Sequence, residues 1–95
     1  MPNKNYQRGY RFEMRVKKAQ EKNGWSVIRQ GKSRFPDLVC FKPATNGLYE
    51  VKYIECKTNK YLSIEEKLKA HEIATKFPFF VAWNNKRMID YYQIT

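Results

Sequence analysis

Residues 36–57 read PDLVCFKPATNGLYEVKYIECK and carry the strongest structural signal in the chain. Two apolar runs, 37–41 and 48–58, flank a segment that ends in Asn-Gly, which is a strong hairpin signal. Each run has the length and composition of a β-strand. The spacing therefore predicts an antiparallel pair in which Asp37 lies beside Glu55.

The segments on either side predict a single α/β domain over 1–95, with the order α-β-β-β-α-β-β. Residues 1–7 are expected to form a loose basic arm, followed by a helix over 8–23 that Gly24 ends and a strand over 25–30. After the hairpin, Ser63 and Glu66 match a capping box that starts a second helix. Strands are expected over 79–83 and 88–94, with a turn at 84–85 between them. The first of these is expected to be a buried strand, although part of its apolar surface could serve a dimer interface. The predicted architecture is a mixed central sheet flanked by helices.

The excess of basic residues indicates which kind of partner the protein binds. The chain has 95 residues and a net charge of +10, and its first 34 residues hold ten basic and two acidic side chains. Such a basic half attracts polyanions, of which nucleic acid is the commonest, although a plain basic surface would have the same charge. No apolar run is long enough to span a bilayer, so we expect no membrane partner. We expect the protein to be cytoplasmic, in the host cell if a virus encodes it. Cys40 and Cys56 lack CxxC spacing, so zinc is disfavoured.

The predicted third strand places an acid and a base on one face. Side chains alternate along a strand, so Glu55 and Lys57 project from the same side. Two carboxylates as close as Asp37 and Glu55 repel each other unless a cation neutralises them. Mg²⁺ needs one or two carboxylates and takes phosphate oxygens as further ligands, so the pattern favours metal-assisted phosphodiester hydrolysis with Lys57 as the helper. The simpler alternative is a surface carboxylate pair beside a solvated lysine.

These residues resemble a known nuclease signature. Pro36-Asp37 followed by Glu55-Cys56-Lys57 is similar to the PD-(D/E)xK motif of the restriction-endonuclease-like superfamily, whose αβββαβ core matches the predicted order. Together with Arg8-Gly9-x-x-x-Glu13, the pattern resembles archaeal Holliday junction resolvases over about residues 8–83. The resemblance implies a homodimer that cuts four-way DNA junctions with Mg²⁺ by paired nicks. It further implies that Mn²⁺ can substitute and that no small-molecule cofactor is used.

The resemblance also assigns roles to single residues. Glu13, Asp37 and Glu55 would form the acidic, metal-binding cluster, with Lys57 as the catalytic lysine. Arg29 would contact the substrate, and Ser33 would lie in the loop that corresponds to the family's mobile serine-containing loop. Glu13 could instead be an ordinary exposed helix acid, and Ser33 a plain loop residue. The residues expected to bind DNA are Arg8, Arg11, Arg15, Arg29, Lys32, Ser33 and Arg34.

One departure from the resolvase pattern bears on selectivity. The archaeal enzymes usually carry an arginine directly after the helix-one glutamate, where this chain has Met14, so Arg11 or Arg15 would have to substitute. The leading hypothesis is a structure-selective Mg²⁺-dependent endonuclease of DNA recombination and repair. Alternatives are another PD-(D/E)xK repair or flap-type nuclease and, less favoured, a non-catalytic DNA-binding protein. Several tyrosines could stack on bases, although strand and core packing explains most of them: Tyr6, Tyr10, Tyr49, Tyr53, Tyr91 and Tyr92.

Overall fold

The first helix is longer than the sequence predicts. A computed structural model describes residues 4–31 and 34–95, and in it α1 spans Lys4–Lys22. Residues 4–7 of the expected loose arm are therefore helical, because they contain neither glycine nor proline and nothing interrupts the helix before Arg8. The first three residues of that arm lie outside the described residues. Gly24 ends the helix as predicted, with a φ of +91° that favours glycine.

Five strands form one mixed sheet whose spatial order follows the chain. They are β1 (Ser26–Arg29), β2 (Leu38–Pro43), β3 (Tyr49–Lys57), β4 (Phe79–Asn85) and β5 (Met88–Ile94). Neighbouring strands are antiparallel except β3 and β4, which are parallel and are joined through α2 (Ile64–Ala74). A short 3-10 turn, Thr45–Gly47, closes the β2–β3 hairpin. The predicted αβββαβ core with a mixed sheet is confirmed.

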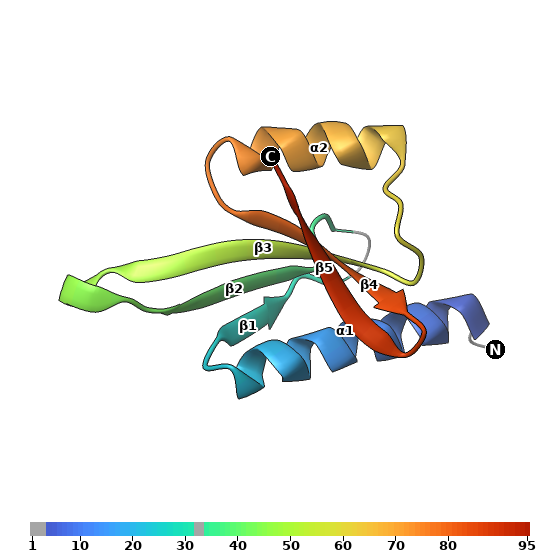
Figure 1. Ribbon diagram of the computed structural model, residues 1–95, viewed down its shortest axis with the longest axis horizontal. Coiled ribbons are helices and arrows are strands. Elements are labelled where there is room, and N and C mark those ends of the chain that lie inside the picture. The colour runs from blue at the N-terminus through green and yellow to red at the C-terminus, as the bar shows by residue number, and fades with distance from the viewer. Residues whose placement is uncertain (1–3, 32–33) are drawn as a thin grey trace.

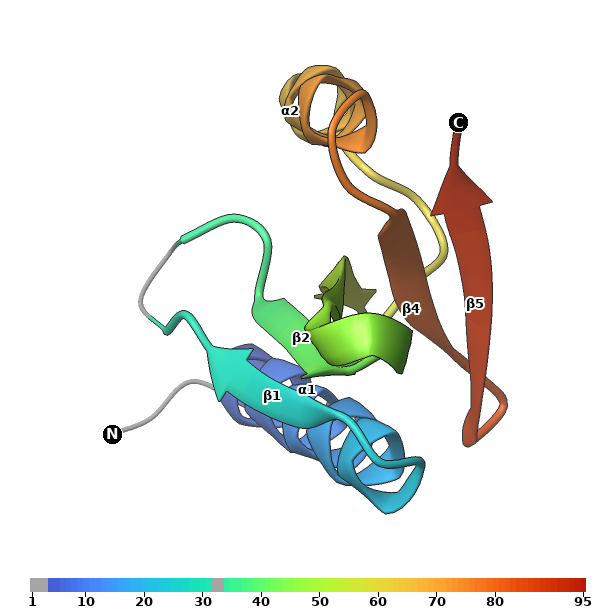
Figure 2. The same cartoon turned by 90° about the vertical axis from the view of Figure 1, so that its left-hand side faces the viewer.

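The two helices lie on opposite faces of the sheet, as Figures 1 and 2 show. On one face, Phe12 and Val16 of α1 pack with Leu38, Cys40 and Ile54 of the hairpin. On the other face, the buried residues are Leu62, Ala70, Phe79 and Val81. Side chains of a strand alternate between faces, so the central strands contribute to both cores. Each core residue named here is at most 6% exposed, so the hairpin that carries Asp37 and Glu55 packs against a core on each face of the sheet.

The second half of the chain differs from the prediction in two places. The turn between β4 and β5 falls at Lys86 and Arg87, both with positive φ, and 84–85 belong to β4. The strands pair beyond the expected turn, with Asn85 opposite Met88, and positive φ at both central residues is typical of a type I′ two-residue hairpin turn. The apolar strand of 79–83 is buried within the chain, with Phe79, Val81 and Ala82 fully covered, so its main surface is not free for a dimer. Within the described residues, no helix is long and apolar enough to cross a bilayer.

Candidate active site

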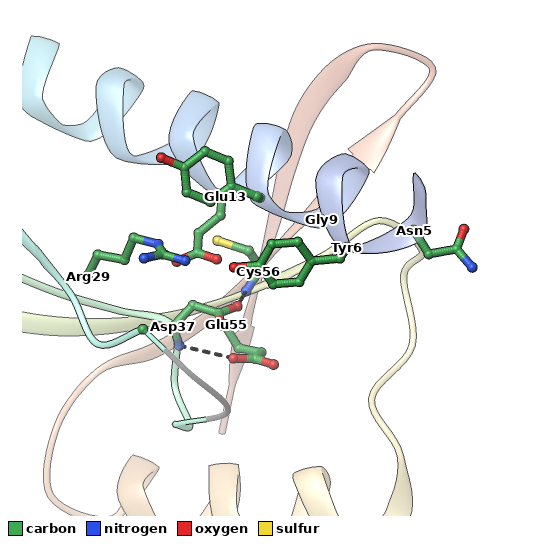
Figure 3. A pocket seen from close by; sticks show the side chains of 10 residues that line it. Asn5, Tyr6, Gly9, Glu13, Arg29, Asp37, Glu55 and Cys56 are labelled. Carbon is green, nitrogen blue, oxygen red and sulfur yellow. Dashed lines mark hydrogen bonds and ion pairs between the residues drawn. The ribbon is translucent and has the colours of Figure 1, made fainter. Parts of the chain in front are cut away.

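The register of the β2–β3 hairpin brings the two key carboxylates together. Leu38 pairs with Ile54, so the preceding Asp37 lies opposite Glu55. The backbone N–H of Asp37 donates to Glu55 Oε1 at 3.1 Å, the dashed line in Figure 3. In return, Asp37 Oδ2 accepts the backbone N–H of Cys56 at 2.9 Å. Each carboxylate is thus held by the backbone of the other's strand, and the predicted neighbourhood of Asp37 and Glu55 is present.

Burial makes this carboxylate pair hard to ionise. Glu55 is 7% exposed, and burial, followed by the negative charge of Asp37, raises its pKa from an ordinary 4.5 to about 9. The pKa of Asp37 is also raised, chiefly by burial, while the Cys56 amide and the Glu55 carboxyl oppose the rise by hydrogen bonding. Without a cation, the pair therefore retains a proton at neutral pH.

Lys57 is held by an acid that the sequence did not assign to the site. Its Nζ lies 3.0 and 3.1 Å from the two carboxylate oxygens of Glu66, in the first turn of α2. The same Glu66 closes the capping box with Ser63, accepting the Ser63 N–H at 2.8 Å. Hydrogen bonds from Ser63 and Lys57 hold the pKa of Glu66 below its usual range despite some burial. The start of α2 and the position of the lysine are therefore coupled through one side chain.

Glu13 reaches the same site from α1, where it forms an ion pair with Arg29. Arg29 Nε lies 2.7 Å from Glu13 Oε1, although the two groups are not aligned as a good hydrogen bond. The Glu13 side chain is 12% exposed, so the alternative of an ordinary exposed helix acid does not hold. Burial and the negative charge of Asp37 raise its pKa, against the lowering effect of Arg29. A pocket of about 640 Å³ is lined by Glu13, Arg29, Asp37 and Glu55 together (Figure 3).

The other predicted DNA-binding residues lie in two further places. Arg8, Arg11 and Arg15 line a separate hollow of about 550 Å³ along α1, which Asn84 also borders. Arg15 donates to the Arg87 carbonyl oxygen at 2.5 Å and is thereby tied to the β4–β5 turn. Arg34 is exposed in the loop before β2.

Two candidates, Lys32 and Ser33, lie outside the described residues. The basic partner of Glu13 is Arg29 of β1, whereas Arg15 bonds to the Arg87 carbonyl oxygen, so within the described part of the chain Arg29 pairs with the helix-one acid.

The residues at this site fit a hard divalent cation with two carboxylate ligands. Asp37 is half-buried and Glu55 buried, the two are adjacent, and burial together with the charge of Asp37 disfavours ionisation of Glu55, a cost that a cation relieves. Over residues 4–31 and 34–95, no three acidic, histidine or cysteine side chains are arranged as a ready metal cage. The predicted three-acid site is therefore not preassembled, because Glu13 is turned toward Arg29. The role of Glu13 as a metal ligand remains a prediction.

The αβββαβ core, with Asp37, Glu55 and Lys57 at its β2–β3 hairpin, has the restriction-endonuclease-like fold expected from the sequence. Among solved structures, the chain is similar to Hjc of Archaeoglobus fulgidus, a Holliday junction resolvase from an archaeal hyperthermophile. The two are 26% identical with a TM-score of 0.70, over 92% of this chain and 73% of that one. The predicted resemblance to archaeal Holliday junction resolvases is thus confirmed in structure. No family model and no curated protein matches the chain.

Proposed function

We propose that this protein is a structure-selective, Mg²⁺-dependent DNA endonuclease that resolves four-way junctions by paired phosphodiester hydrolysis. The observation that carries the proposal is the adjacency of the Asp37 and Glu55 carboxyl groups at the end of the hairpin, held by the backbone amides of Asp37 and Cys56, with Lys57 two residues beyond Glu55. The +10 net charge and the structural similarity to an archaeal resolvase support DNA as the substrate. A homodimer would place two such sites on the two-fold related strands of a junction.

The roles of the side chains follow from their positions. Asp37 and Glu55 would hold Mg²⁺, which, when bound, activates water and neutralises charge on the scissile phosphate. Lys57 would donate hydrogen bonds to the attacking water or to a phosphate oxygen, and Glu66 keeps its ammonium group in place. Arg29, oriented by Glu13, provides a guanidinium in the same pocket for a neighbouring phosphate. The arginines along α1 would hold the DNA backbone without reading its sequence.

The test is cleavage of a labelled, immobile four-way junction in Mg²⁺ and in Mn²⁺, with wild type beside Glu55→Gln and Asp37→Asn. We expect symmetric nicks from the wild type and a loss of at least about 10²-fold in each variant, since each removes a preorganised charge from the reacting centre. Binding, measured in Ca²⁺, should persist in both variants. Cutting of flaps but not of junctions would indicate a repair nuclease of the same class. Binding without cutting in either metal would leave a DNA-binding protein.

A further inference from the structure

One wall of the active-site pocket is aromatic and remains uncovered by the fold. Tyr6 and Tyr10 lie one turn apart on α1 and both line the pocket that Asp37 and Glu55 also line. Figure 3 shows the Tyr6 ring near Cys56 and Glu55. Tyr6 is 65% exposed and Tyr10 42% exposed, and neither belongs to either hydrophobic core. Core packing, which we expected to explain most of the tyrosines, does not account for these two.

Gly9 lines the same pocket as the two tyrosines and leaves the helix surface there open. A Cβ placed on Gly9 would meet no atom within 4 Å, and the residue also lines the pocket. A glycine inside a helix is less favourable than alanine, and Gly9 is not among the glycines with a positive φ. Neither helix stability nor backbone conformation therefore calls for a glycine here. What its missing side chain provides is space beside the tyrosines.

The pocket also holds a fixed positive charge next to this wall. The Arg29 guanidinium carbon lies 4.9 Å from the centre of the Tyr10 ring, and its Nε is paired with Glu13. Two exposed rings, a guanidinium and the carboxylate pair thus line one cavity of about 640 Å³. These groups match the parts of a single nucleotide, since a base stacks on aromatic rings while its phosphate is attracted to a cation.

We propose that Tyr6 and Tyr10 form a subsite for an unstacked nucleobase at the branch point of the DNA, beside the phosphate that is cut. The inference rests on the proposed nuclease function and deepens it. Inside a duplex the flat faces of the bases are covered by their neighbours, so exposed rings gain contact only with a base that has left the stack. A branch point is where such a base is available. The subsite would therefore favour branched over continuous DNA, whereas the arginines of α1 bind both.

The test is a binding cycle between protein and DNA, carried out in Ca²⁺ so that the result does not depend on cleavage. The protein variants are Tyr6→Ala/Tyr10→Ala, the matching double phenylalanine variant, and Tyr49→Ala as a control. Tyr49 is 68% exposed but lies at the opposite end of β3 from Glu55. The DNA variants are immobile four-way junctions in which each branch-point nucleotide in turn is abasic, together with a linear duplex of the same length.

We expect the double alanine variant to bind the intact junction about tenfold more weakly than wild type does, with duplex binding unchanged. The phenylalanine and Tyr49→Ala variants should bind as wild type does. At one branch-point position, removing the base should weaken junction binding by wild type about tenfold and leave binding by the double alanine variant unchanged. The abasic site and the alanine substitutions then break the same contact. An abasic penalty that is equal in both proteins at every position would overturn the subsite.

A second variant keeps the rings and removes only the space. Gly9→Leu should raise helix propensity while its side chain fills the gap beside the tyrosines, so junction binding should fall by the same factor with duplex binding retained. Unchanged junction binding in Gly9→Leu, or equal weakening on duplex and junction in either variant, would contradict the proposal. If the variants lose junction binding as expected but the wild type never cuts, the base subsite stands and the proposed nuclease function fails. Failure of the subsite and failure of the nuclease function are therefore distinguishable.

Discussion

Replacing Glu55 with glutamine should stabilise the metal-free protein while removing cleavage. Burial and the charge of Asp37 raise the pKa of Glu55 to about 9, so the folded chain must keep a proton on this carboxyl that the unfolded chain releases. Glutamine is neutral at every pH. Its carbonyl oxygen can still accept the Asp37 N–H, which lies 3.1 Å from the present Oε1. The substitution removes the cost of protonation and keeps the hydrogen bond.

The expected gain follows from the linkage between protonation and folding. The difference between the ordinary pKa of 4.5 and pH 7 is about 2.5 pH units. At ~1.36 kcal/mol per unit, protonation of Glu55 at pH 7 costs the folded state roughly 3 kcal/mol, which the variant regains as free energy of unfolding. For a domain of this size that raises Tm by more than about 10 °C. Between pH 4.5 and about 9 the folded state binds more protons than the unfolded one, so wild-type stability falls as pH rises. The advantage of the variant should vanish near pH 4.5 and level off above pH 9.

The assay is urea-induced unfolding in EDTA at several pH values from 5 to 9.5, for wild type, Glu55→Gln and Glu50→Gln. Glu50 lies in the same strand but its side chain is 54% exposed, so its substitution should change the free energy of unfolding by less than about 0.5 kcal/mol. Added Mg²⁺ should stabilise wild type far more than Glu55→Gln, because it binds the folded carboxylate pair. A Glu55→Gln protein that is less stable than wild type at pH 8, or that keeps the wild-type pH slope, would refute this reasoning.

Three further outcomes are expected. Glu66→Gln retains a side chain suited to the capping box but loses the charge that holds Lys57, so single-turnover cleavage should slow by about tenfold while melting temperature barely moves. Replacing Arg8 and Arg11 with glutamine should weaken binding to duplex and junction alike and flatten the dependence of log K on log salt by about 0.9 per lost phosphate contact, measured by anisotropy titrations. Ile54→Ala should cost about 2–5 kcal/mol in urea unfolding, because Ile54 is fully buried between helix and sheet.

The sequence was sufficient wherever local signals fix geometry. The Asn-Gly turn and the two apolar runs set the hairpin, and the hairpin alone places Asp37 beside Glu55. The capping box at Ser63 likewise predicted the start of α2 to the residue. Such features depend on residues that are close in sequence, so hydrophobic periodicity and the residue types of turns and caps are enough to predict them.

Contacts between distant segments could not be predicted in the same way. The capping box identified Glu66, but nothing local shows that its carboxylate also reaches Lys57 across the loop between β3 and α2. The ion pair of Glu13 with Arg29 depends on how α1 lies against β1, a packing angle that periodicity does not give. The β4–β5 turn was misplaced because Lys86 and Arg87 are not typical residues for positive φ, whereas the preceding asparagines are.

The hydrogen bonds from the Asp37 N–H to Glu55 and from the Cys56 N–H to Asp37 have an evolutionary consequence. Both acids close the ends of β2 and β3 by accepting backbone amides, so they serve as parts of the scaffold as well as parts of the proposed chemistry. A descendant that kept DNA binding but gave up cutting would still be under selection to retain hydrogen-bond acceptors at these two positions. Lys57 bonds to a side chain of α2 and closes no strand. Among relatives of this protein, an intact lysine would therefore be a better indicator of retained cleavage than the acids that precede it.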